Sequence, residues 1–241
     1  MTVDRHLEWE GGFNIRDLGA ITTHDGRKTR RGAVVRSGSL HHLTESGWRA
    51  LATYGVRTII DLRNTNEREA ENYIAPSSEI TCVHLPIEEE RDPPDAEFWK
   101  QWRAFNCSPL YYIAFLTQYP DRTSAVIAHI ANARPGGVLF HCGIGRDRTG
   151  LISLLLLKLI GATHEEIVSD FLLSTERLRP HWARLGRRND EDDIAKLFER
   201  EKSSAASAII ATITEIDGAA RFRATGIGDN DLDVLRARFM E

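Results

Sequence analysis

The residues with the clearest chemical potential lie in one run of ten, from His141 to Gly150, with the sequence His-Cys-Gly-Ile-Gly-Arg-Asp-Arg-Thr-Gly. Cys142 is a nucleophile when ionised, and Arg148, six positions later, carries a planar guanidinium that matches two oxygens of a phosphoryl group. A thiolate can attack phosphorus in line while a guanidinium holds the equatorial oxygens. The run therefore predicts a phosphate-ester site with Cys142 and Arg148 as catalytic residues.

The residues around this pair predict a cradle for phosphate. An apolar strand ends at His141, a loop with two glycines follows, and a helix begins near Arg148, so loop N–H groups and the positive helix end face one point. His141 is interpreted either as a hydrogen-bonding support of the loop or as a satisfied core histidine. Thr149 is expected to donate to the sulfur when the cysteine leaves a phosphocysteine. The expected phosphate-binding residues are Gly143, Ile144, Gly145, Arg146, Asp147 and Arg148.

Two carboxylates are candidates for the general acid that protonates the leaving oxygen. Asp147 lies inside the loop, although an aspartate just before a helix is also a favoured N-cap. Asp61 ends an expected strand, and in open parallel sheets ligands lie beyond the carboxyl ends of strands. The alternative role of Asp61 is an ion pair with Arg63 or another arginine. The residues alone leave both candidates open.

The sequence pattern around these residues predicts an α/β fold, in which a parallel-rich central sheet is flanked by helices. Short apolar stretches alternate with helical ones from Ala33 to Gly161. Strands are expected over residues 56–61, 80–87 and 138–141, and a centrally buried helix over 151–160. Further helix signals are Thr44 as an N-cap with Gly55 at the end, Ser108 before Pro109, a capping box of Thr163 with Glu166, and Asn230 as the last N-cap.

We expect one domain over residues 1–241, with a candidate lid insertion at 88–120 and a C-terminal helical part at 191–241. Between Glu88 and Asn106, glutamates, prolines and tryptophans occur without clean periodicity. One interpretation is a surface excursion in which Phe98, Trp99 and Trp102 pack as a single face. The other is a mobile helical lid over a pocket, because loops of this length are often functional.

The composition describes an ordinary globular chain of 241 residues, with 41% hydrophobic and 27% charged residues. A net charge of −4 argues against nucleic-acid binding, and the basic cluster at 27–31 is interpreted as a solvated turn rather than a nucleic-acid or lipid-headgroup patch. The irregular spacing of Cys82, Cys107 and Cys142 predicts free thiols in a reducing compartment, the first two as packing residues. No signal peptide or membrane-spanning stretch is evident, so a cytoplasmic protein without stable membrane insertion is expected.

The ten-residue run resembles the signature of the tyrosine phosphatase superfamily, in which five residues separate His-Cys from Arg and then Ser or Thr. Three more motifs are similar to those of one branch, the atypical bacterial tyrosine/serine phosphatases, and the resemblance covers nearly the whole chain. The three motifs are Asn14-Ile15-Arg16-Asp17-Leu18-Gly19, Arg36-Ser37-Gly38-Ser39-Leu40 and Asp61-Leu62-Arg63, and a similar segment near the C-terminus is Leu235-Arg236-Ala237-Arg238-Phe239. The chain departs from this branch at Arg146, where members commonly carry lysine.

The resemblance implies hydrolysis of phosphotyrosine through a phosphocysteine intermediate, without a metal or other cofactor. It extends the candidate substrates to phosphoserine, phosphothreonine and phosphoinositide monoesters, so the expected partner is a phosphorylated protein or a phosphoinositide, bound by a monomer or weak dimer. It favours Asp147 as the acid and supports the lid interpretation. Two alternatives stay open: a rhodanese-like sulfurtransferase, which shares a cysteine at the base of such a loop, and a non-catalytic phosphate-binding module.

Overall fold

A five-stranded sheet with the order β1-β2-β5-β3-β4 organises the protein. The structure is a computed structural model that describes residues 4–89, 93–186, 188–216 and 229–240. Strands β2, β5, β3 and β4 are parallel, and β1 pairs antiparallel with β2. The parallel-rich α/β fold is thus confirmed. The strand bounds are β1 (Arg16–Asp17), β2 (Val34–Ser37), β3 (Val56–Asp61), β4 (Thr81–His84) and β5 (Gly137–His141).

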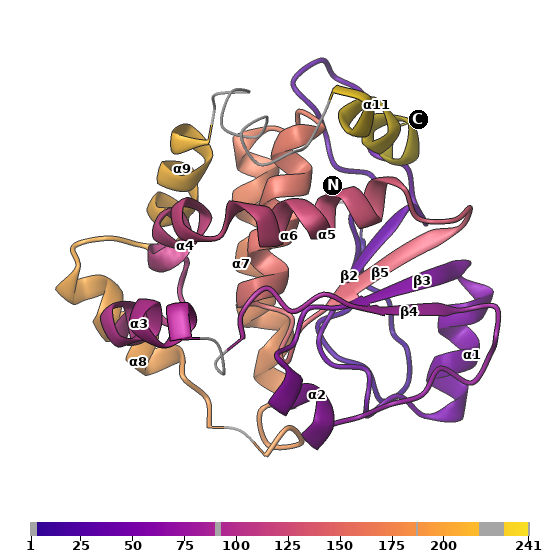
Figure 1. Ribbon diagram of the computed structural model, residues 1–241, viewed down its shortest axis with the longest axis horizontal. Coiled ribbons are helices and arrows are strands. Elements are labelled where there is room, and N and C mark those ends of the chain that lie inside the picture. The colour runs from indigo at the N-terminus through magenta and orange to yellow at the C-terminus, as the bar shows by residue number, and fades with distance from the viewer. Residues whose placement is uncertain (1–3, 90–92, 187, 217–228, 241) are drawn as a thin grey trace.

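Helices cover both faces of this sheet, with α1 on one side and α5 and α6 on the other (Figure 1). The α-helices are α1 (Glu45–Thr53), α2 (Thr65–Ala70), α3 (Pro93–Trp102), α4 (Tyr112–Gln118), α5 (Pro120–Ala131), α6 (Asp147–Leu159), α7 (His164–Leu178), α8 (Glu191–Arg200), α9 (Ala205–Glu215) and α11 (Asp229–Phe239). Short 3-10 turns are η1 (Arg103–Phe105), η2 (Pro109–Tyr111) and η3 (Arg179–His181).

The pleat of the central strands divides the core into two clusters. In β5, Val138 and Phe140 belong to the cluster that contains the leucines of α6, whereas Leu139 belongs to the cluster that contains Trp48 and Leu51 of α1. This alternation follows from the period of two residues in a strand. A strand buried on both faces is held firmly, so the loop that leaves β5 starts from a fixed point.

Local signals in the sequence account for the elements next to that loop. The side chain of Thr44 accepts a hydrogen bond from the Gly47 N–H at the start of α1, and Gly55 adopts a φ of 98° after its end. Both features confirm the expected helix. Residues 151–157 of α6 are all buried, as the uniformly apolar stretch 151–160 predicts, and Leu159 is partly buried.

Strand β4 is shorter than the stretch 80–87 that the sequence predicts. It ends at His84, because Pro86 has no N–H to donate and β4 is the outermost strand of the sheet. Its edge position leaves Cys82 exposed, so the expectation that Cys82 is a packing residue is wrong. Cys107 is half-buried, and all three cysteines have free thiols, as predicted.

Two expected helix caps differ from the structure. Asn230 lies within α11, which already begins at Asp229, because the sequence Asp229-Asn230-Asp231 offers several polar residues that could start a helix. The Thr163 hydroxyl accepts from the Glu166 N–H, but the Glu166 carboxylate accepts from the Thr22 N–H instead of completing a capping box. Pro109 opens the 3-10 turn η2, which leads into α4.

The candidate lid segment contributes to the core. Phe98 and Trp99 of α3 are buried in the same cluster as α6, and Trp102 packs against it while partly exposed. These contacts fit the interpretation of the three aromatic residues as one packed face. Residues 90–92 of the segment lie outside the described residues, and its movement stays a prediction. No helix in the described ranges is long and apolar enough to cross a membrane.

Candidate active site

The ten-residue run forms the connection between β5 and α6. In the parallel register, His141 lies opposite Ser37 of β2 and Asp61 of β3, so three strands end side by side under the loop. Gly145 has a φ of 72°, and a Cβ there would lie 2.5 Å from the Ser37 carbonyl oxygen, so only glycine fits. Cys142, at the start of the loop, is 2% exposed.

The scaffold holds this loop by its carbonyl oxygens. Asn14 Nδ2 donates to the carbonyls of Ile144 (3.1 Å) and Gly145 (2.9 Å), and Arg36 donates to Gly145 at 2.8 Å. Within the part of the chain that the structure describes, the N–H groups of residues 143–146 donate to no other group. A loop whose carbonyls are bound and whose N–H groups are unused can receive an anion.

A buried aspartate organises the residues that hold the loop. Asp170 of α7 pairs with Arg5 and Arg16 at 3.0 Å and with Arg36 at 2.5 Å, and Arg16 in turn donates to Asn14. Although burial opposes ionisation, the arginines outweigh it and hold the pKa of Asp170 far below its usual range. The sequence motifs contain Asn14, Arg16 and Arg36, but no local pattern marks Asp170 as their common partner.

Arg148 is held by two glutamates that the sequence did not single out. Glu67 accepts from both terminal nitrogens, Nη2 to Oε1 at 2.7 Å, and Glu88 Oε2 lies 3.6 Å from Nε. Although burial opposes the charged form, the pKa of Arg148 is raised well above its usual value by Glu67, Glu88 and Cys142. The sequence contains one indication of this arrangement, the capping box of Asn64 and Glu67 at the start of α2.

Glu88 itself is a largely buried acid between α6 and η2, with 13% of its side chain exposed. Its carboxylate accepts from the Tyr111 hydroxyl at 3.1 Å and faces Arg148. Burial raises the pKa of Glu88 to about 7, although Arg148 and Tyr111 oppose this shift. Near neutral pH the charge beside Nε of Arg148 therefore depends on the protonation of one carboxyl.

The two charged residues inside the loop interact with each other. Helix α6 begins at Asp147 itself and its N-cap is Arg146, so the alternative that Asp147 is the N-cap is wrong. Arg146 Nε lies 3.1 Å from Asp147, and its two terminal nitrogens contact Asp190 at 2.8 and 2.7 Å. The Tyr112 hydroxyl donates to the Asp147 carbonyl at 2.6 Å. Arg146 thereby ties the loop to the segment before α8.

Asp61 is turned toward its neighbour rather than toward the loop. Its two oxygens lie 2.9 and 2.8 Å from Nε and Nη2 of Arg63, as the ion-pair interpretation predicts. Although burial opposes ionisation, His141 and Arg63 outweigh it and lower the pKa of Asp61. An acid with a lowered pKa carries no proton at neutral pH, so Asp61 is poorly suited to donate one.

His141 supports the loop from below. One ring nitrogen lies 3.1 Å from the Cys142 carbonyl oxygen and the other lies 2.6 Å from the Tyr73 hydroxyl. Burial lowers the pKa of His141, so the neutral ring is favoured. The Thr149 hydroxyl is buried and has no hydrogen-bond partner among the described residues. The bond from Thr149 to the departing sulfur belongs to the breakdown of the phosphocysteine and stays a prediction.

The sequence is similar to a family model and to several known proteins. A family model described as the tyrosine phosphatase family matches residues 7–241. A Cupriavidus necator protein, provisionally named a tyrosine-protein phosphatase, is 31% identical over 180 residues, which cover 72% of this chain. The triple specificity protein phosphatase PtpB of Mycobacterium tuberculosis is 26% identical over 205 residues, 74% of this chain and 72% of that protein.

These matches differ in extent. The chain spans 64% of the length of the Cupriavidus protein. A crystal structure of P. aeruginosa TpbA aligns with 89% of this chain and 91% of that chain, at a TM-score of 0.43 and 15% identity. The residues matched by the family model, 7–241, include the motif that contains Asn14 and the whole loop around Cys142. The chain therefore belongs to the tyrosine phosphatase family.

Proposed function

We propose that this protein is a metal-independent phosphatase that hydrolyses phosphotyrosine through a phosphocysteine intermediate. The observation that carries the proposal is the loop from Cys142 to Arg148, with unused N–H groups above the ends of three strands, in a member of the tyrosine phosphatase family. The family match over residues 7–241 favours this activity over sulfur transfer. An intact Cys142 and Arg148 favour it over a silent phosphate reader.

The proposed reaction has two steps. The Cys142 thiolate attacks phosphorus, the bond from phosphorus to the leaving oxygen breaks, and protonated Asp147 gives that oxygen its proton. Water then attacks the phosphocysteine, Asp147 takes a proton from the water, and the sulfur leaves. The loop N–H groups and Arg148 hold the equatorial oxygens in both steps.

Arg148 can serve this reaction without leaving Glu67. A guanidinium carries five N–H donors, and Glu67 occupies two of them, which leaves Nε and one hydrogen on each terminal nitrogen. A phosphate that approaches Nε comes close to Glu88, 3.6 Å away. We propose that protonated Glu88 admits the phosphate dianion more readily than the ionised form.

The substrate range and setting are part of the proposal. PtpB is named a triple specificity protein phosphatase, which supports phosphoserine and phosphothreonine as further candidate substrates, and phosphoinositides stay candidates on the family resemblance. We place the protein in the cytoplasm as a monomer or weak dimer. The segment 88–120 is proposed as the lid, because its first residue, Glu88, already contacts Arg148.

The deciding experiment replaces the nucleophile. Cys142→Ser should lower kcat by roughly 10⁵-fold while still binding a phosphotyrosine analogue. Rapid quench of the wild type should yield a phosphorylated cysteine and a burst of phenol product. EDTA should not change the rate; within the described residues, no cluster of His, Cys, Asp and Glu could hold a metal ion. Full activity in Cys142→Ser would falsify the mechanism, and thiosulfate turnover without phosphatase activity would favour the sulfurtransferase.

A further inference from the structure

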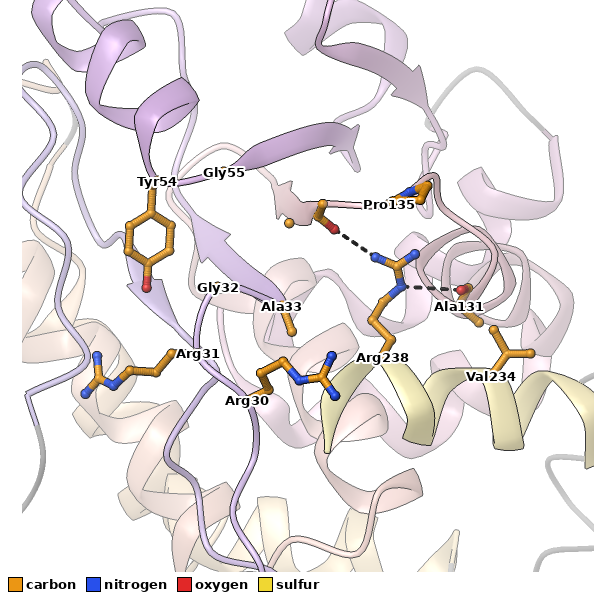
Figure 2. A pocket seen from close by; sticks show the side chains of 12 residues that line it. Arg30, Arg31, Gly32, Ala33, Tyr54, Gly55, Ala131, Pro135, Val234 and Arg238 are labelled. Atoms are coloured by element: carbon orange, nitrogen blue, oxygen red, sulfur yellow. Dashed lines mark hydrogen bonds between the residues drawn. The ribbon is translucent and has the colours of Figure 1, made fainter. Parts of the chain in front are cut away.

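A second concentration of positive charge lies at the other end of the sheet. A cavity of about 590 Å³ is lined by the segments that lead into β2, β3 and β5 and by one side of α11. Its charged side chains are Arg30, Arg31 and Arg238, and none of the described residues that line it is acidic. Figure 2 shows Arg238 near the turn at Pro135, Arg30 beside α11, and Arg31 on the side of Tyr54. We call this cavity the arginine pocket.

The guanidinium groups of the arginine pocket are held by backbone carbonyls. Arg238 donates to the Gly136 carbonyl at 2.9 Å and to other carbonyls at the end of α5, Arg30 donates to Met240 at 2.6 Å, and Arg31 donates to Asp4 at 2.9 Å. Within the described ranges, none of the three arginines of the pocket forms an ion pair with a carboxylate. Backbone carbonyls fix these side chains, and the Asp4 carboxylate and the Tyr54 hydroxyl also lie close enough to interact with Arg31. The positive charge of the arginine pocket is therefore only partly balanced.

Uncompensated charge in a partly buried place is unfavourable. Arg238 is half-buried and burial lowers its pKa, with no carboxylate that raises it. At the active site, by contrast, two glutamates raise the pKa of Arg148. An anion in the arginine pocket would supply the missing negative charge.

The remaining donors suit an oxygen-rich anion. Both hydrogen bonds of Arg30 come from Nη2, and the backbone contact of Arg31 also comes from Nη2, so Nε and Nη1 of each face no backbone acceptor within the described chain. Planar guanidinium groups bind phosphate through two parallel bonds. A cavity of this size also falls within the range of small-molecule sites.

We propose that the arginine pocket is a second anion site that binds a phosphate-bearing ligand, separate from the catalytic loop. The ligand carries at least two negative charges, either as a free phosphorylated compound or as the phosphate headgroup of a lipid. The sequence interpretation as a solvated turn holds for Arg27, which pairs with exposed Asp25. Arg30 and Arg31 are exposed as well, as that interpretation predicts, and they also line the pocket.

Titration with inorganic pyrophosphate tests this site. By calorimetry, the wild type should bind two equivalents, one at the catalytic loop and one in the arginine pocket. The double variant Arg30→Gln/Arg31→Gln should lose one equivalent or bind it at least about tenfold more weakly, because two charge-assisted contacts are removed. Its hydrolysis of p-nitrophenyl phosphate should equal that of the wild type, which shows that the fold and the catalytic loop are intact.

The matched control is Arg27→Gln, which changes the same basic cluster outside the pocket and should keep both equivalents. Sedimentation with phosphatidylcholine vesicles, with and without phosphatidic acid, separates the two ligand sources. Binding that requires phosphatidic acid and is lost in the double variant assigns the site to a lipid headgroup, and pyrophosphate binding alone assigns it to a free ligand. A single equivalent in the wild type, or two equivalents of unchanged affinity in the double variant, overturns the proposal.

Discussion

The two ends of the parallel sheet both gather arginines, but each end balances their charge differently. Beyond the carboxyl ends of the strands, Arg148 is paired with Glu67 and Glu88, and Arg146 with Asp147 and Asp190. Before the strands begin, the arginine pocket holds its guanidiniums by backbone carbonyls. At the first end, Arg146 and Arg148 each lie beside two carboxylates, whereas the arginines of the pocket form no ion pair with a carboxylate among the described residues.

Carboxylate and carbonyl partners have different consequences for a guanidinium. A carboxylate fixes a guanidinium strongly and in one orientation, which a reaction with in-line geometry needs, but it also competes with the phosphate. A carbonyl fixes the group less strongly and leaves its charge available to a ligand. We therefore expect substitutions at the first end to change rates, and substitutions at the second end to change binding and stability.

Among the arginines, the largest expected effect comes from replacing the forked guanidinium of Arg148. Arg148→Lys keeps the charge but loses the paired donors for Glu67 and the phosphate, so kcat/KM should fall by roughly 10³-fold. The matched change Arg238→Lys in the arginine pocket should leave kcat/KM unchanged and lower the free energy of unfolding by about 1–2 kcal/mol, since it loses carbonyl contacts at the end of α5. Steady-state kinetics and denaturant unfolding measure both.

Equal kinetics of Arg148→Lys and the wild type would contradict bidentate holding of the phosphate. A large loss of kcat in Arg238→Lys would erase the distinction between the two ends of the sheet. In either case, charge pairing would no longer explain which arginines take part in catalysis.

The next effect concerns the proton donor. Asp147→Asn should slow hydrolysis of phosphotyrosine by roughly 10²-fold and hydrolysis of p-nitrophenyl phosphate only slightly, because an activated leaving group needs little protonation. The alkaline limb of its pH profile should disappear. Asp61→Asn should slow both substrates alike, because it removes the carboxylate that lies closest to the buried Arg63. If the two variants exchange these patterns, Asp61 is the acid.

What the sequence could predict was local. Glycine at position 145, the cap at Thr44 and the uniformly apolar helix after Gly150 each depend on residues within a few positions, so the loop and its flanking elements were predicted correctly. The length of β4 was overestimated, because apolar residues continue past Pro86 although the strand itself ends at His84.

The partners of the charged residues could not be predicted in this way. Glu67 lies 81 residues from Arg148, and Asp170 lies 134 residues from Arg36. No spacing rule connects such positions, because only the folded chain brings them together. A buried aspartate in the middle of α7 is a weak signal, since it has the same appearance in the sequence as a solvated one.

The smallest expected kinetic change is in KM. It tests whether the charge of Glu88, rather than its shape, affects phosphate binding at Arg148. Glu88→Gln keeps the shape and the contact with Tyr111 but removes the titration of Glu88. In the wild type, substrate affinity should fall as pH rises through about 7, when Glu88 becomes ionised beside Nε of Arg148. The variant should not show this step, and at about pH 8 its KM should be on the order of fivefold lower than that of the wild type. Exposed Glu97→Gln, on α3, is the matched control.

Stability provides an independent measurement of the same group. The folded pKa of Glu88 is raised from 4.5 to about 7, so its contribution to stability is present at low pH and is lost as pH rises through about 7. Between about pH 5 and 8 the wild type should therefore lose up to roughly 3 kcal/mol relative to Glu88→Gln in denaturant unfolding. Parallel curves would show that Glu88 is ionised throughout and does not control the charge at Arg148. A large loss of phosphotyrosine hydrolysis with activated substrates spared would instead make Glu88, rather than Asp147, the proton donor.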